Sequence, residues 1–234
     1  MNAMSTRVDW VAASESLHSN GYAVVADVLD PAQCDELRAL YDAPVGFRKT
    51  VVMERYRFGR GEYKYFDYPL PPLVQRIRTA MYPHLADVAN AWMQALSLPD
   101  RFPGTHAELL ERCHVAGQDK ATVLLLRYGA GGFNTLHQDL YGELYFPIQL
   151  VLFLDRPGVD HEGGEFVLIE QMPRAQSKAI VLRPERGSML LFTTNFRPVK
   201  GTRGYYRAAM RHGVSTVHKG QRHTLGVIFH DAHS

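Results

Sequence analysis

A histidine and an aspartate one residue apart, His137 and Asp139, have the side chains and spacing of paired metal ligands. Residues 122–127 form an apolar run that predicts a buried strand, and the glycines of 129–132 break it before a second extended segment. On a strand, residues i and i+2 point to one face, so imidazole and carboxylate would converge. This suits a first-row metal. A surface hydrogen bond is the alternative, and a third ligand would decide between the two.

The same ligand types recur at His106 and Glu108, in a stretch with helical periodicity. On a helix, residues two apart lie on different faces, so we expect this pair to be structural. His212 is the preferred third ligand, at the start of a predicted strand. Two histidines and one carboxylate on one face of an octahedral iron leave three positions for substrate and oxygen, as in non-haem iron(II) oxygenases.

An arginine and a threonine on the next predicted strand extend the motif. Arg222 lies ten residues beyond His212, and Thr224 lies two beyond Arg222 on the same strand face. A guanidinium group binds a carboxylate through two parallel hydrogen bonds, and the threonine hydroxyl is a further donor. His218 is the rival third ligand, but it stands only four residues before Arg222. That spacing leaves too little length for a dicarboxylate between metal and arginine, so His212 is favoured.

The composition is that of an ordinary globular protein of one substantial domain. The 234 residues are 46% hydrophobic and 21% charged. We find no apolar run of about 18 residues and no signal-peptide pattern, so we expect a cytoplasmic protein without membrane association. Cys34 and Cys113 are the only cysteines, which excludes a disulfide framework and a cysteine-based zinc site. The eleven histidines remain as metal ligands.

Charge is unevenly distributed along the chain. The net charge is only +2, yet residues 186–230 contain no Asp or Glu. A local excess of this kind predicts an anionic ligand or partner, and a solvated basic surface is the alternative. The eight cations of this segment are Arg186, Arg197, Lys200, Arg203, Arg207, Arg211, Lys219 and Arg222.

Residues 1–115 predict a helical and mixed supporting region. Asp30 caps a helix that begins with a proline. Residues 44–72 interleave aromatic and cationic side chains, which either pack on the core as an irregular ribbon or line a substrate groove. Helical periodicity over 73–97 then indicates one helix, or two if Pro83 breaks it.

Residues 116–234 predict an antiparallel β-core that completes a single compact domain. Short apolar runs separated by turns give about eight strands, at the spacing of a sandwich or barrel. They are the two around His137 and the runs 146–154, 165–169, 178–182, 188–192, 213–217 and 224–229.

In this order, the motifs resemble the 2-oxoglutarate/Fe(II)-dependent oxygenase superfamily. Its pattern is His-x-Asp, a long gap, then His followed by Arg-x-Ser or Arg-x-Thr, and this chain has each part. Residues 21–37 look like the family's opening strand and helix. Residues 163–166 resemble the turn after the iron-bearing hairpin, and 186–192 the strand before the distal histidine. The resemblance covers most of residues 21–230.

The resemblance implies a mainly β fold, a double-stranded β-helix of the jelly-roll or cupin-like type flanked by helices. It implies that 2-oxoglutarate chelates Fe(II), that Arg222 holds its far carboxylate, and that O2 is the oxidant. Tyr128 matches a tyrosine that bonds this carboxylate in prolyl-hydroxylase-like members, and Thr224 has a similar role. Gln149 and Phe153 line the pocket or belong to the core. The implied iron ligands are His137, Asp139 and His212.

For the substrate, the sequence looks most like a bacterial branch described as oxidative nucleic-acid demethylases. There, hydroxylation of an N-methyl group releases formaldehyde. Residues 44–72 and the basic segment are compatible with a stacked base and a phosphate backbone, and residues 192–207 with a lid. Prolyl-type hydroxylation of a protein side chain is the alternative, and small molecules rank third. From other classes, a cupin-like metal-binding protein and a non-catalytic nucleic-acid-binding protein stay open.

Overall fold

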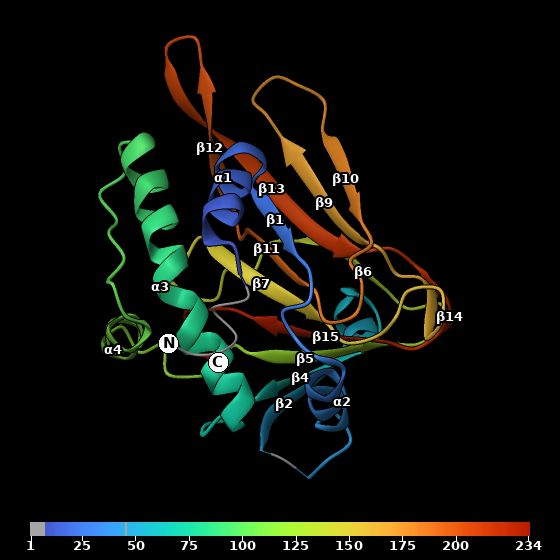
Figure 1. Ribbon diagram of the computed structural model, residues 1–234. Coiled ribbons are helices and arrows are strands. Elements are labelled where there is room, and N and C mark those ends of the chain that lie inside the picture. The colour runs from blue at the N-terminus through green and yellow to red at the C-terminus, as the bar shows by residue number, and fades with distance from the viewer. Residues whose placement is uncertain (1–7, 45) are drawn as a thin grey trace.

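The computed structural model describes residues 8–44 and 46–234. Two antiparallel sheets face each other, with helices packed outside one of them (Figure 1). In spatial order, the seven-stranded sheet contains β1 (Tyr22–Val25), β11 (Met189–Thr193), β7 (Ile148–Phe153), β15 (Arg222–Val227), β5 (Leu124–Tyr128), β4 (Glu62–Phe66) and β2 (Phe47–Val52).

The second sheet has six strands, five of them in one continuous order. Its order is β10 (Lys178–Leu182), β9 (Phe166–Gln171), β13 (Gly204–Val214), β6 (Phe133–His137) and β3 (Gly59–Arg60), with β12 (Phe196–Gly201) paired to β13. A small separate ladder joins β8 (His161–Gly163) to β14 (Val217–Gly220). The predicted double-stranded β-helix of the jelly-roll type is confirmed.

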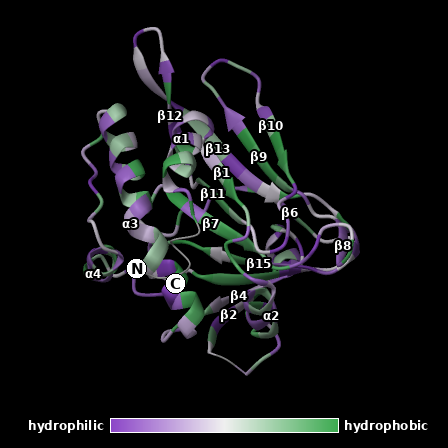
Figure 2. Ribbon diagram, viewed as in Figure 1, coloured by the Kyte–Doolittle hydropathy of each residue, from purple (hydrophilic) through white to green (hydrophobic). Residues whose placement is uncertain are grey.

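The central strands of the seven-stranded sheet, β7, β11 and β15, are buried on both faces, which explains the apolar runs in this part of the sequence. In β7, Leu150 and Leu152 pack into the cluster that contains the helices, whereas Val151 and Phe153 pack between the sheets. A strand buried on both sides needs no polar alternation. Figure 2 shows the central strands of this sheet largely in the colour of hydrophobic residues.

The second sheet is buried on one face only, so its strands alternate. Along β13, Tyr205, Arg207 and Arg211 are exposed. On the other face of the strand, Ala208, Met210 and His212 are buried. This alternation directs His212 into the space between the sheets.

Four α-helices are found in the described part of the chain: α1 (Trp10–Asn20), α2 (Pro31–Ala39), α3 (Pro72–Ala95) and α4 (His106–Val115). Asp30 and Gln33 form a capping box at the start of α2, as the sequence predicts for Asp30. The break considered at Pro83 is wrong, because α3 continues through it. Buried side chains on both sides of the proline, including Met81 and Leu85, hold the helix in place.

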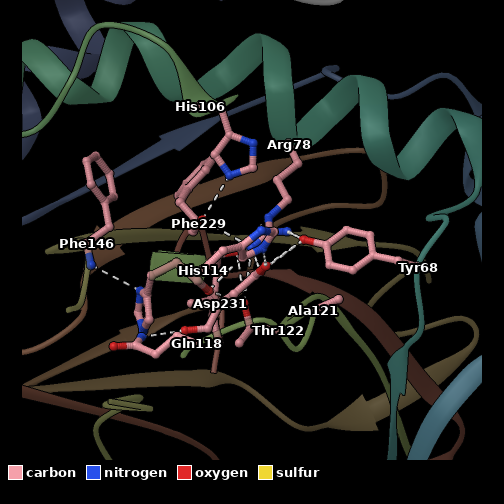
Figure 3. Close-up of polar contacts among 12 residues, drawn as sticks. Tyr68, Arg78, His106, His114, Gln118, Ala121, Thr122, Phe146, Phe229 and Asp231 are labelled. Carbon is pink, nitrogen blue, oxygen red and sulfur yellow. Dashed lines mark hydrogen bonds and ion pairs between the residues drawn. The ribbon is translucent and has the colours of Figure 1, made fainter. Parts of the chain in front are cut away.

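Arg78 of α3 anchors the segment after β15 and is itself fully buried (Figure 3). Its Nη2 lies 2.8 Å from Oδ1 of Asp231, and its Nη1 donates to the Tyr68 hydroxyl at 2.7 Å. Its remaining donors reach Thr122 Oγ1 and the carbonyls of residues 228–230. In α4, Nε2 of His106 lies 2.9 Å from the carbonyl oxygen of Phe229. The expected structural role of His106 is thus observed.

Two further expectations need correction. The run 213–217 is not one strand, because β13 ends at Val214 and β14 begins at Val217. Residues 192–207 are not a separate lid, since most of them belong to β11, β12 and β13; the β12–β13 hairpin projects beyond the sheets (Figure 1). Strands β1, β2 and β4 extend the first sheet and β3 the second, across the predicted division at residue 115. Among the described helices, none has the length and apolarity to cross a membrane.

Candidate active site

The structure brings His137, Asp139 and His212 together at one end of the space between the sheets. His137 and His212 are Cα partners in the β6–β13 ladder, so their side chains share a face. Nε2 of His212 lies 3.2 Å from Oδ2 of Asp139, and Nε2 of His137 lies 3.6 Å from its Oδ1. One ligand atom from each residue lies within 4.8 Å of the others. This donor set fits a first-row metal.

Neighbouring groups orient both imidazoles. Nδ1 of His137 lies 2.7 Å from the Thr135 carbonyl oxygen. Because this oxygen is an acceptor, the ring proton sits on Nδ1, and the lone pair of Nε2 is available to a metal. The His212 ring is stacked on Phe166, with an interplanar angle of 8°, and meets the edge of Phe192. Burial, followed by the nearby His137, lowers the pKa of His212. Both rings are therefore positioned to bind a metal through Nε2.

Asp139 is held by a hydroxyl group that the sequence analysis missed. Tyr141 donates to Oδ1 of Asp139 at 2.6 Å, and Tyr65 donates to the Tyr141 oxygen at 3.1 Å. Burial alone would raise the pKa of Asp139, but His212, His137 and the Tyr141 hydroxyl together lower it. The carboxylate is thus charged, which is the state that could bind a metal. Tyr141 lies in the irregular segment after β6, so no periodic pattern in the sequence pointed to it.

Arg222 lies in the same cavity and lacks a partner for its charged end. Its guanidinium carbon lies 5.6 Å from the ring centre of Tyr128 and 5.5 Å from that of Phe153. Its Nη1 and Nη2 are buried and have no hydrogen-bond partner among the described residues. Burial lowers the pKa of Arg222. An uncompensated buried cation is costly, and a carboxylate is the ligand that matches both nitrogens.

The remaining predicted residues surround this cavity, which has a volume of about 220 Å³. Tyr128 is the Cα partner of Arg222 across β5 and β15, and its hydroxyl accepts from Asn134 at 3.4 Å. Thr224 and Gln149 both line the cavity, and Nε2 of Gln149 has no partner in the described chain. Phe153 is instead part of the core between the sheets.

His218, the rival ligand, is exposed on β14 and does not join the ligand cluster. Four of the eight cations in 186–230 are paired with a carboxylate or lie in the cavity, and the Lys219 pair is on the surface. Arg186 pairs with Asp35, Arg197 with Glu170 and Lys219 with Glu162, and Arg222 lies in the cavity. The other four, Lys200, Arg203, Arg207 and Arg211, are exposed on the β12–β13 hairpin and its tip.

Comparison with known proteins identifies the family. A family described as "oxygenase, catalysing oxidative methylation of damaged DNA" matches residues 61–232. Uncharacterized proteins from two Mycobacterium tuberculosis strains, CDC 1551 / Oshkosh and ATCC 25618 / H37Rv, are each 44% identical over 167 residues. Each match covers 71% of this chain and 72% of the relative.

Solved structures with the same fold are more distant in sequence. A 2OG-Fe(II) oxygenase family oxidoreductase from Burkholderia pseudomallei has a TM-score of 0.57 and 16% identity, over 96% of this chain and 93% of that one. A prolyl-4-hydroxylase from Pseudomonas putida has a TM-score of 0.56 and 15% identity, over 95% and 98%. A Trichoplax adhaerens prolyl hydroxylase, solved with a hypoxia-inducible-factor peptide, has a TM-score of 0.52 and 14% identity, over 97% and 95%.

Family and fold agree with the chemistry of the donor set. The oxygenase family covers most of the chain, the fold is that of the 2OG-Fe(II) oxygenases, and the cavity holds a His-Asp-His cluster. The predicted enzyme class and cofactors are therefore confirmed. The chain belongs to the Oxygenase-NA family and is a dioxygenase that depends on Fe(II) and 2-oxoglutarate.

Proposed function

We propose that this enzyme oxidises N-methyl groups on the bases of damaged DNA. The family description supports a DNA substrate. Insertion of oxygen into a C–H bond of an N-methyl group gives an N-hydroxymethyl group, which separates into formaldehyde and the unmethylated nitrogen. The oxidation therefore removes the methyl group. Fe(II), when bound, supplies the activation of O2, while 2-oxoglutarate is converted to succinate and carbon dioxide.

In this proposal, Nε2 of His137, Nε2 of His212 and the Asp139 carboxylate hold the metal. Arg222 binds the far carboxylate of 2-oxoglutarate, with Thr224 and Tyr128 as neighbouring hydroxyl donors. The observation that carries this assignment is the buried Arg222 guanidinium, whose two terminal nitrogens lack partners in the cavity of the His-Asp-His cluster. A dicarboxylate between metal and arginine satisfies both.

The chain's other cavity residues exclude water and restrict approach. Apolar side chains, among them Val151, Phe166 and Phe192, line much of the cavity wall. An apolar wall keeps bulk water from the reacting methyl group. Phe58 and Tyr63 also line the cavity, and they belong to the ribbon of residues 47–66. We therefore place the entrance for the base at this ribbon.

The first test is an anaerobic titration with Fe(II) and 2-oxoglutarate, followed by the visible charge-transfer absorption of the chelate. We expect His212→Ala to abolish the absorption, and Arg222→Ala to weaken 2-oxoglutarate binding at least tenfold through the lost charge-assisted pair. A cupin-like protein without a dicarboxylate site would be indifferent to Arg222→Ala. Wild-type protein that gives neither absorption nor succinate under oxygen would contradict the site assignment.

The second test addresses the substrate. Single-stranded oligonucleotides that carry 1-methyladenine or 3-methylcytosine are incubated with enzyme, Fe(II), 2-oxoglutarate and oxygen. We expect the wild-type enzyme to release formaldehyde and succinate in equal amounts. The His137→Ala variant should release no formaldehyde. Proline-containing peptides serve as the competing substrate. Hydroxyproline formation without formaldehyde release would favour the prolyl-hydroxylase alternative.

A further inference from the structure

A second hollow of about 240 Å³, which we call the side pocket, adjoins the active-site cavity. The two share Phe58, Tyr63 and Tyr141 in their walls. Arg48 and Lys49 are among the other lining residues, and no Asp or Glu lines the pocket in the described chain. A ligand that reaches the metal therefore has an aromatic and cationic recess beside it.

The ribbon that forms this pocket is fixed to the metal-bearing strand. Thr135 donates to the Phe58 carbonyl through its backbone N–H and its hydroxyl, both at 2.9 Å. Gly59 follows with φ +136°, and a Cβ there would lie 2.2 Å from the carbonyl oxygen of Phe133. Only glycine permits this approach. The ribbon thus meets β6 two residues before His137.

Two aromatic side chains that line the side pocket are exposed to solvent. Tyr56 is 55% exposed and Phe58 is 46% exposed. Their ring centres lie 5.5 Å apart with an interplanar angle of 20°, so they form a stacked pair. Exposed rings beside a reactive cavity offer a flat surface to a planar ligand, and base stacking on such rings is sequence-tolerant. Tyr56 lines only the side pocket of the two hollows.

The cations around the pair are available for an anion. Arg48 lies over the Tyr65 ring at 4.6 Å and bonds the Ala121 carbonyl through Nε. Neither Arg48 nor the exposed Lys49 pairs with a carboxylate in the described chain, and the same holds for Arg55 on the ribbon. Rings to stack on and unpaired cations together match a nucleotide.

We infer that the side pocket binds the nucleotide that flanks the methylated base, in a single-stranded or extruded segment. The flanking base stacks on the Tyr56–Phe58 pair, and its phosphate lies near Arg48 and Lys49. This inference rests on the proposed nucleic-acid substrate. The β12–β13 hairpin does not compete for this role, because Arg207 and Arg211 lie on the face of β13 opposite His212. A base in a duplex could not present its flat face to the pair.

The test measures binding alone, by fluorescence anisotropy of a labelled oligothymidylate strand that contains one 1-methyladenine, without metal or 2-oxoglutarate. We expect Tyr56→Ala to weaken binding about tenfold or more, through the lost stacking. We expect Lys49→Glu to weaken binding and to make the slope of log K against log salt less negative by about 0.7, the value for one phosphate contact.

Tyr205→Ala and Lys200→Glu are matched controls, because both residues are exposed on the projecting hairpin. Both controls should bind as wild type, and all four variants should keep wild-type 2-oxoglutarate binding, which shows that they are folded. If only the two hairpin variants lost binding, the inference would be overturned, and the β12–β13 hairpin would be the binding surface for the oligonucleotide.

The outcomes also separate this inference from the proposed function. Wild-type protein that does not bind the oligonucleotide overturns the inference. Formaldehyde release with unchanged binding and turnover in Tyr56→Ala and Lys49→Glu overturns the side pocket and leaves demethylation intact. No formaldehyde from any methylated strand, with binding still lost in both variants, keeps the pocket and overturns the proposed reaction.

Discussion

At the scale of single residues, Asp139 and Arg222 show how burial defines the chemistry of the cavity. Asp139 is a buried carboxylate that two imidazoles and one hydroxyl keep charged. Arg222 is a buried guanidinium to which the described chain offers no acceptor at its two terminal nitrogens. The cavity thus holds opposite charges, and in the proposed assignment Asp139 binds the metal and Arg222 binds the dicarboxylate.

Tyr141→Phe removes the hydroxyl that orients Asp139 and changes little else in volume. We expect metal affinity to fall about tenfold, the lower end of the range for groups that support a metal ligand. Calorimetric titration with Mn(II) measures this directly. Tyr65→Phe is the graded control, because Tyr65 reaches Asp139 only through Tyr141, and its effect should be smaller. Equal affinities in wild type and Tyr141→Phe would contradict this role.

Arg222→Lys tests geometry at constant charge. Lysine cannot present two parallel donors, so we expect 2-oxoglutarate to bind at least tenfold more weakly, with unchanged Mn(II) affinity. Equilibrium dialysis with labelled 2-oxoglutarate and Mn(II) separates the two. If both affinities fell together, Arg222 would be supporting the metal site instead of the co-substrate.

At the scale of elements, the positions of the proposed metal ligands follow from the pairing of β6 with β13 and from the one buried face of the second sheet. The cross-strand pairing of β6 with β13 puts His137 and His212 on one face. The i, i+2 alternation expected for His137 and Asp139 does not apply, because β6 ends at His137 and Asp139 lies in the irregular segment that follows. The β12–β13 hairpin was missed, because residues 196–203 include a proline, a glycine and no regular alternation. Tyr141 follows β6 in an irregular segment, where periodicity makes no prediction.

The contact of α3 with the C-terminal segment was equally invisible in the sequence. Arg78 is the residue after Ile77, which belongs to the apolar stripe of α3. Periodicity alone does not show whether an arginine at the edge of such a stripe is buried or solvated. Arg78→Met leaves Asp231 buried without its cation, and we expect unfolding to become about 3–5 kcal/mol easier. Urea denaturation measures this. Arg76→Met, at an exposed position of α3, is the control and should change stability by less than about 0.5 kcal/mol.

At the scale of the whole molecule, the fold could be predicted in part because the two sheets are buried to different extents and leave different sequence patterns. Continuous apolar runs predicted β7, β11 and β15, because a sheet covered on both faces leaves that pattern. The order of the metal-ligand motifs supplied the rest of the architecture. A groove along residues 44–72 was one of two alternatives that the sequence offered. The side pocket itself could not be predicted, since Thr122, Tyr141 and Ala232, which are distant in sequence, complete its walls.

Two buried histidines couple folding of the molecule to pH. Burial lowers the pKa of His106 and of His230 to about 3. In the unfolded chain the pKa of each is about 6.5, so below pH 6.5 the unfolded chain binds more protons than the folded one. The free energy of unfolding therefore decreases as the pH is lowered from about 6.5 to about 3. Each histidine should contribute about 2 kcal/mol of loss between pH 7 and pH 5. Urea unfolding across this range measures the slope, and His106→Gln should reduce it by about one proton. A slope unchanged by that substitution would refute the assignment.

The buried cation at Arg222 has a consequence for the lifetime of the protein. A ligand that neutralises it binds only the folded chain, so its concentration adds directly to folding stability. With the role proposed for Arg222, the enzyme should resist proteolysis better when 2-oxoglutarate and metal are abundant than when they are scarce. The amount of folded enzyme would then follow the supply of its own co-substrate.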